Sequence, residues 1–137
     1  MTDPNIIRLI ITATTLSLAH NVDHAVRGDF NPAKGSEAIA GLIVSAVIYL
    51  IVGAGLWLTV RGLAGPRFWC LFSLFGFGFG WFAHFSPFTE QSVSYIYGAY
   101  PSPAEGGLVV AFLVALMLSL LAATIYTGYR WIKGYAE

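Results

Sequence analysis

The chain has 137 residues, of which 57% are hydrophobic and only 10% are charged, whereas about 25% of the residues of an average soluble domain are charged. So few charged groups cannot cover a water-facing surface, and this composition is typical of an integral membrane protein. The formal net charge is zero, which argues against nucleic acid as a partner and leaves the lipid bilayer as the expected one. We therefore expect a single membrane domain, residues 1–137.

Four apolar stretches follow one another along the chain, separated by short clusters of glycine, proline and charged residues. A membrane-spanning helix needs about 20 mostly apolar residues, and the second, third and fourth stretches lie close to this length. The sequence therefore predicts an all-α, multi-pass membrane protein in which four transmembrane helices form a compact bundle with lipid-facing outer surfaces. The expected spans are about residues 5–27, 38–60, 68–86 and 107–130.

The first stretch differs from the others because its second half is polar. Its apolar run, residues 9–19, rises only about 16 Å as a helix, little more than half of the hydrocarbon thickness of a bilayer. The chain then continues with His20, Asp23 and His24. A helix that crosses the membrane must continue through these residues, so we expect them at membrane depth near one face.

The distribution of Lys and Arg predicts the orientation. Five of the seven basic residues fall on the side shared by both termini and the middle loop, whereas Arg27 and Lys34 fall on the other. Cytoplasmic loops of membrane proteins carry an excess of Lys and Arg. We therefore expect a protein of the cell membrane with both termini in the cytoplasm and with the connections 28–36 and 86–106 outside.

The outer connection between the third and fourth spans is long for a loop. Ser86 followed by Pro87 is typical of a helix start, and tyrosines follow in the same segment. We expect a short helix over residues 87–100, lying at the membrane interface between the two spans. The alternative is an ordinary loop held by its tyrosines at the level of the lipid headgroups.

His20, Asp23 and His24 stand at positions i, i+3 and i+4, so in a helix they project from one side. His84 ends the third span, which runs in the same direction as the first, and it is the third histidine of the chain. All three histidines are therefore predicted to meet at the outer end of the bundle.

Small residues predict how the first and third helices pack. Gly76, Gly80 and His84 recur at intervals of four on the third helix, and the first helix carries Ala13 and Ser17 at a similar spacing. Small residues let membrane helices approach closely. We therefore expect the third helix to pack closely against the first along this line.

Three imidazole nitrogens around one point are a ligand set that suits zinc or copper. His20, His24 and His84 are the predicted metal ligands, and Asp23 is either a fourth ligand, an acceptor that orients a histidine, or a catalytic acid or base. Such a metal ion could serve redox or hydrolytic chemistry on a membrane-associated substrate. Haem b, held by His84 and one of the other histidines, is a second form of the same hypothesis.

Two further interpretations need no cofactor. The histidine cluster could be a polar clamp in a non-catalytic accessory subunit, whose partners would be further copies or other membrane subunits of a larger complex. Alternatively, the same residues could act as acid and base on a lipid, an isoprenoid or a quinone. The sequence alone does not decide whether the protein is an enzyme.

Overall fold

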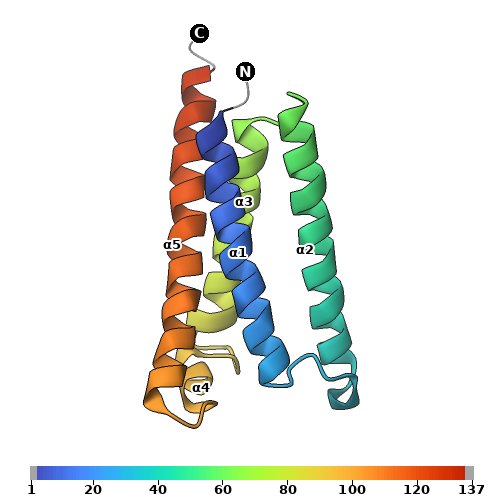
Figure 1. Ribbon diagram of the computed structural model, residues 1–137, viewed down its shortest axis with the longest axis vertical. Coiled ribbons are helices and arrows are strands. Elements are labelled where there is room, and N and C mark those ends of the chain that lie inside the picture. The colour runs from blue at the N-terminus through green and yellow to red at the C-terminus, as the bar shows by residue number, and fades with distance from the viewer. Residues whose placement is uncertain (1–2, 135–137) are drawn as a thin grey trace.

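The computed structural model describes residues 3–134, and the regular elements within them are all helical (Figure 1). The elements are α1 (Pro4–Val26), a 3-10 turn η1 (Pro32–Lys34), α2 (Ser36–Val60), α3 (Pro66–Phe85), the short α4 (Val93–Gly98) and α5 (Pro103–Gly134). The prediction of an all-helical protein is confirmed. The two ends of the predicted domain 1–137 lie outside the described residues.

Prolines mark where three of the four long helices begin. Pro4, Pro66 and Pro103 each stand at the start of a helix, where the missing N–H group of proline costs no hydrogen bond. The Asp3 side chain caps α1 by accepting a hydrogen bond of 3.0 Å from the backbone N–H of Asn5. Helix α5 begins earlier and ends later than the span predicted from hydropathy.

Helices α2, α3 and α5 are long and apolar enough to cross a membrane. Their outer surfaces carry large hydrophobic side chains, with Leu50 71%, Phe75 69% and Leu118 61% exposed. Apolar surface of this extent indicates contact with lipid or with another protein. Helix α1 carries polar groups in its second half and is not among the three, so its crossing of the membrane remains a prediction.

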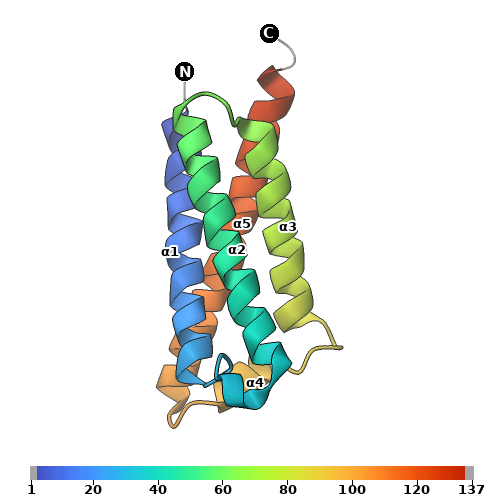
Figure 2. The same ribbon diagram turned by 90° about the vertical axis from the view of Figure 1, so that its right-hand side faces the viewer.

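The four long helices run along one common axis, and α5 packs against both α1 and α3 (Figures 1 and 2). Helix α2 stands apart from this group and contacts α1 only lightly. The start of α1, the end of α5 and the α2–α3 turn lie at one end of the molecule, and α4 and the α1–α2 connection lie at the other (Figure 1). This arrangement places both described chain ends on the same side of the fold.

The hydrophobic core lies nearer the end where α1 begins. Trp69 is fully buried there, and its indole Nε1 donates a hydrogen bond of 2.8 Å to the Thr59 hydroxyl. This bond ties the start of α3 to the end of α2. The buried residues of the core are Ile6, Ile10, Val52, Trp69 and Ala123.

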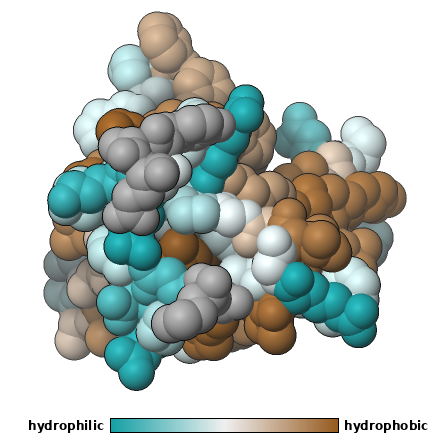
Figure 3. Space-filling view, turned by 90° about the horizontal axis from the view of Figure 1, so that it is seen from above, coloured by the Kyte–Doolittle hydropathy of each residue, from teal (hydrophilic) through white to brown (hydrophobic). Residues whose placement is uncertain are grey.

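Hydrophilic residues gather on the end of the molecule that carries the chain ends, and hydrophobic side chains border it (Figure 3). Basic residues near the helix ends lie over aromatic rings, which suits the boundary between hydrocarbon and water. These pairs are Arg61 with Trp57, Arg67 with Trp131, and Lys133 with Tyr129.

The glycine line of α3 faces α5, so the predicted close packing of α3 against α1 is wrong. A Cβ added to Gly80 would lie 2.8 Å from the Met117 sulfur, and one added to Gly76 would lie 3.5 Å from Leu120. The long side chains of α5 fill the groove that the glycines leave. Helices α1 and α3 instead border a common cavity and meet through their histidines.

The outer segment is helical over a shorter range than the predicted 87–100, because only Val93–Gly98 forms a helix. Ser86 ends α3 and does not start a new helix. The Thr89 hydroxyl donates a hydrogen bond of 2.5 Å to the backbone carbonyl of Ala83. The chain therefore turns back to satisfy the last turn of α3 before α4 begins. The position of α4 at a membrane interface remains a prediction.

Candidate metal centre

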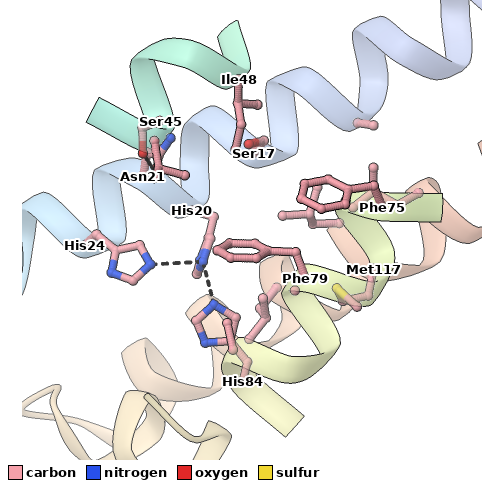
Figure 4. A pocket seen from close by; sticks show the side chains of 18 of the residues that line it. Ser17, His20, Asn21, His24, Ser45, Ile48, Phe75, Phe79, His84 and Met117 are labelled. Atoms are coloured by element: carbon pink, nitrogen blue, oxygen red, sulfur yellow. Dashed lines mark hydrogen bonds between the residues drawn. The ribbon is translucent and has the colours of Figure 1, made fainter. Parts of the chain in front are cut away.

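Three histidine side chains come together near the end of the molecule opposite the chain ends (Figure 4). His20 and His24 lie one turn apart on α1, and His84 lies in the last turn of α3. The Nε2 atom of His20 is 3.0 Å from Nε2 of His84 and 3.2 Å from Nε2 of His24. The histidine group predicted from the sequence is therefore formed, and it could hold a metal ion.

The separations of the three ring nitrogens are close to those of a metal site. In tetrahedral zinc sites the metal–nitrogen distance is about 2.0–2.1 Å, which places two ligand nitrogens about 3.3 Å apart. Two of the three separations in the group are 3.0 and 3.2 Å, and all three ligand atoms lie within 4.8 Å of one another. The side chains of His20 and His24 are 12% and 17% exposed and His84 is buried, so the group is largely shielded from bulk water.

The outer nitrogen of His84, Nδ1, points away from the other two histidines and is held by the segment that follows α3. Its Nδ1 donates a hydrogen bond of 2.9 Å to the backbone carbonyl of Gln91. Because a carbonyl oxygen only accepts hydrogen bonds, the proton of the neutral ring lies on Nδ1, and Nε2 presents a lone pair to the other histidines.

The outer nitrogen of His24 faces a carboxylate. Its Nδ1 lies 3.0 Å from Oδ2 of Asp29, and the same oxygen lies 2.6 Å from Nη1 of Arg27. A second guanidinium nitrogen of Arg27 lies 3.2 Å from Nδ1 of His24, but the shorter contact to the carboxylate favours a protonated Nδ1. Nε2 of His24 then also presents a lone pair to the group.

His20 lies between these two lone pairs. Its Nε2 can donate its single proton to only one of them, so one contact would join two lone pairs unless a cation lies within the group. Its Nδ1 is 3.8 Å from Oδ2 of Asp23, which is longer than a hydrogen bond. All three Nδ1 atoms thus face oxygen atoms while the Nε2 atoms converge, as in histidines that bind a metal ion.

Asp23 lies on the outer side of His20, away from the converging Nε2 atoms. The carboxylate is buried and accepts hydrogen bonds of 2.9 and 2.8 Å from Nε and Nη2 of Arg27. The Tyr100 hydroxyl donates a third hydrogen bond, of 2.6 Å, to Oδ1 of Asp23. Burial and this bond to a carboxylate raise the pKa of Tyr100 to about 12. Asp23 therefore links α1 to the segment that precedes α5.

Asp29, Gln91 and Tyr100 were not singled out from the sequence. Asp29 stands only five residues after His24, so a search for acceptors near the histidines would have found it. Gln91 contributes a backbone carbonyl to His84, and no side-chain pattern reports such a contact. Tyr100 reaches Asp23 across 77 positions of the chain, a pairing that only the fold creates.

The histidine group closes one end of a cavity of about 550 Å³ that α1, α2, α3 and α5 border (Figure 4). This volume lies within the range of about 300–1,000 Å³ that is usual for small-molecule sites. The walls away from the histidines are mostly apolar, and α3 contributes several phenylalanines. The converging ring nitrogens are therefore accessible from an apolar chamber.

Comparison of the chain with models of known protein families, with curated proteins and with solved structures finds no match. The fold and the site themselves define a class. The protein is all-helical within residues 3–134, with three helices able to span a membrane and a histidine group that could hold a metal ion.

Proposed function

We propose that the protein is a membrane metalloprotein in which His20, His24 and His84 bind one transition metal ion, zinc or copper. The observation that carries this proposal is the orientation of the rings, whose Nδ1 atoms face oxygen atoms while their Nε2 atoms converge. For His24 and His84 this orientation fixes the tautomer that a metal requires. The chain has no further histidine, so the whole imidazole content of the protein lies in this group.

Asp23 supports the site without binding the metal in this proposal. Its two oxygens are engaged by Arg27 and Tyr100, and the residue does not border the cavity. The carboxylate lies 3.8 Å from Nδ1 of His20, so in this proposal it supports the ring by its negative charge and not by a direct hydrogen bond. Asp23 is thus a positioning residue, and the proposal gives it no acid or base role.

Helix α1 is proposed to be a fourth membrane crossing, with both termini cytoplasmic. The support is that α1 lies along α5 and carries the metal ligands in its second half. Its polar side chains find partners inside the protein: Asp23 pairs with Arg27, and Asn21 pairs with Tyr49. Ionisable groups at membrane depth are tolerated when they face the protein interior and are paired in this way.

Three protein ligands leave a fourth position open, which is the arrangement of catalytic metal sites. The histidines border the cavity, so the open position is proposed to face it. Zinc there would supply hydrolytic chemistry and copper would supply redox chemistry. In either case the reacting group would reach the metal through the apolar chamber.

The geometry favours an ion held by side chains over haem b. Two nitrogens on opposite faces of one haem iron lie roughly 4 Å apart with the porphyrin plane between them. Nε2 of His20 and Nε2 of His84 are only 3.0 Å apart, and His24 approaches the same nitrogen of His20 from a further direction. A flat macrocycle would have to displace at least one of the three rings.

Elemental analysis and an optical spectrum of the protein purified in mild detergent test the proposal. The wild type is expected to carry zinc or copper in stoichiometric amount, and His24→Ala is expected to lose it. Ser45→Ala is the matched control, because Ser45 bonds Asn21 across α1 and α2 at 3.3 Å without touching a histidine. If the wild type binds neither metal even after incubation with both, the histidines are a polar clamp or a cofactor-free acid–base site.

A further inference from the structure

The cavity is elongated along the helix axes. Its lining on α1 extends from His24 to Ile10, a rise of about 21 Å in an α-helix. On α3 the lining extends from His84 to Phe72, about 18 Å. A volume of about 550 Å³ spread over this length makes a narrow chamber that suits a chain better than a globular molecule.

Polar groups gather at the histidine end of the chamber. Beside His20, the Tyr49 hydroxyl of α2 accepts a hydrogen bond of 2.5 Å from the Asn21 amide and lies 3.2 Å from the Ser17 hydroxyl. The opposite end is formed mostly by apolar side chains such as Ile10. The Thr14 hydroxyl in this half bonds the backbone carbonyl of Ile10 at 2.7 Å. The Ser73 hydroxyl is buried and has no hydrogen-bond partner within residues 3–134.

The side wall of the chamber opens between α2 and α3. Val44 on α2 and Phe75 and Phe79 on α3 line the cavity, yet these three side chains are 44%, 69% and 50% exposed. Both helices are long and apolar enough to span a membrane. An opening bordered by such side chains would face lipid, so a molecule dissolved in the bilayer could enter without passing through water.

We infer that the chamber binds a membrane amphiphile, a molecule with one long hydrocarbon chain and an oxygen-bearing polar head. The head lies at His20 and His84, and the chain runs toward Ile10 and Phe72. Binding of this molecule needs only the chamber, whereas its role as the substrate of the metal centre rests on the proposed function. The narrow apolar chamber excludes water-soluble metabolites and disfavours lipids with two chains.

Photolabelling of the full chain with a long-chain fatty acid tests this inference. The probe carries a diazirine near its methyl end, so label is expected at the deep end of the chamber, on the segments that contain Ile10 and Phe72. A prenyl quinone and a long-chain alcohol are then added as competitors. Loss of label shows which of the two head groups, quinone or hydroxyl, the chamber accepts.

Two variants fill the chamber away from the histidines. Ala13→Phe places a ring in the lining of α1, where Ala13 is buried, and Ser73→Leu replaces the buried Ser73 hydroxyl in the lining of α3. Each variant is expected to lower labelling of the deep end about tenfold or more. A single misfitting group in an apolar pocket weakens binding by at least about this factor. The matched control is Ala46→Phe, at an exposed position of α2 that does not line the cavity.

Metal content measured on the same samples separates this inference from the proposed function. If both filling variants keep their metal and label as strongly as the wild type, or if label falls only on residues outside the chamber, the inference is overturned and the metal centre stands. If the deep end is labelled but no sample binds metal, the chamber stands and the proposed function fails. Circular dichroism identifies a variant that has failed to fold, and the other filling variant then decides the result.

Discussion

Nε2 of His20 and Nε2 of His84 lie 3.0 Å apart, although the two residues are separated by 64 positions and stand on different helices. Two imidazole nitrogens at this distance need a proton or a cation between them, because two lone pairs repel each other. The ring of His84 is held from behind by the backbone carbonyl of Gln91. The geometry of the group therefore depends on residues behind the ligands, and the contribution of each can be measured separately.

Asp29→Asn is expected to weaken metal binding about 10- to 100-fold, the usual effect of removing an acceptor behind a metal-binding histidine. The reason is that Asp29 holds Nδ1 of His24 at 3.0 Å, and a neutral amide is a weaker acceptor that can also turn its NH₂ group toward the ring. The measurement is a competition titration with a zinc chelator in detergent.

The control for this experiment is Glu37→Gln, which removes the same charge from an exposed position in the first turn of α2. Its affinity for zinc should equal that of the wild type. Equal affinities in all three proteins would show that Asp29 does not orient His24.

Tyr100→Phe is expected to change how stability depends on alkaline pH. The pKa of Tyr100 is raised in the folded protein from 10.0 to about 12, so the neutral hydroxyl stabilises the fold fully below pH 10. This contribution is lost as the pH rises from 10 toward 12. Tyr100→Phe should be less stable than the wild type by about 1–3 kcal/mol at neutral pH, because Asp23 loses a partner.

Thermal unfolding in detergent between pH 7 and pH 12 measures this difference. The two stability curves should converge above pH 10, since the other tyrosines are common to both proteins and cancel in the comparison. Curves that coincide over the whole range would mean that the bond between Tyr100 and Asp23 contributes no stability.

Gly106→Ala is expected to destabilise the protein by about 1–3 kcal/mol, the usual cost of overpacking. A Cβ on Gly106 would overlap the backbone carbonyl of Tyr97 in α4, and a backbone atom cannot move away as a side chain can. The neighbouring Gly107→Ala is the control, because its Cβ would come no closer than 4.0 Å to the Tyr97 ring.

Alanine favours a helix by up to about 1 kcal/mol over glycine, so Gly107→Ala should be neutral or slightly stabilising. Unfolding midpoints of the two variants provide the test. If Gly106→Ala were as stable as Gly107→Ala, the close contact between α4 and α5 would not exist in solution.

The positions of α2 and α3 could be predicted from the sequence because each is an apolar stretch between short clusters of glycine, proline and charged residues. The predicted span 38–60 corresponds to Ser36–Val60, and the predicted span 68–86 corresponds to Pro66–Phe85. The meeting of the histidines followed from the i, i+4 spacing of His20 and His24 and from the position of His84 at a helix end. The spacing is a local feature of one helix, and the position of His84 follows from the first and third spans running in the same direction.

The packing partners of the helices could not be predicted in the same way. Hydropathy shows that a helix is apolar but not which neighbour it faces, so the glycine line of α3 was assigned to α1 when Met117 and Leu120 of α5 occupy it. The extent and shape of the cavity could not be predicted either, since they depend on the distance between α2 and the other helices. The contribution of the Gln91 carbonyl to the site depends on a turn that has no sequence signature.

X-ray absorption spectroscopy of the zinc-loaded protein shows whether the three histidines bind the metal, because it reports the atoms bound to the metal. We expect three nitrogen ligands at about 2.0–2.1 Å with the outer-shell scattering of imidazole rings, plus one further light atom in the open position. In His84→Gln the imidazole scattering should fall by one ring. A shell of oxygen atoms without imidazole scattering, or identical spectra for the wild type and His84→Gln, would show that the histidine group does not bind the metal.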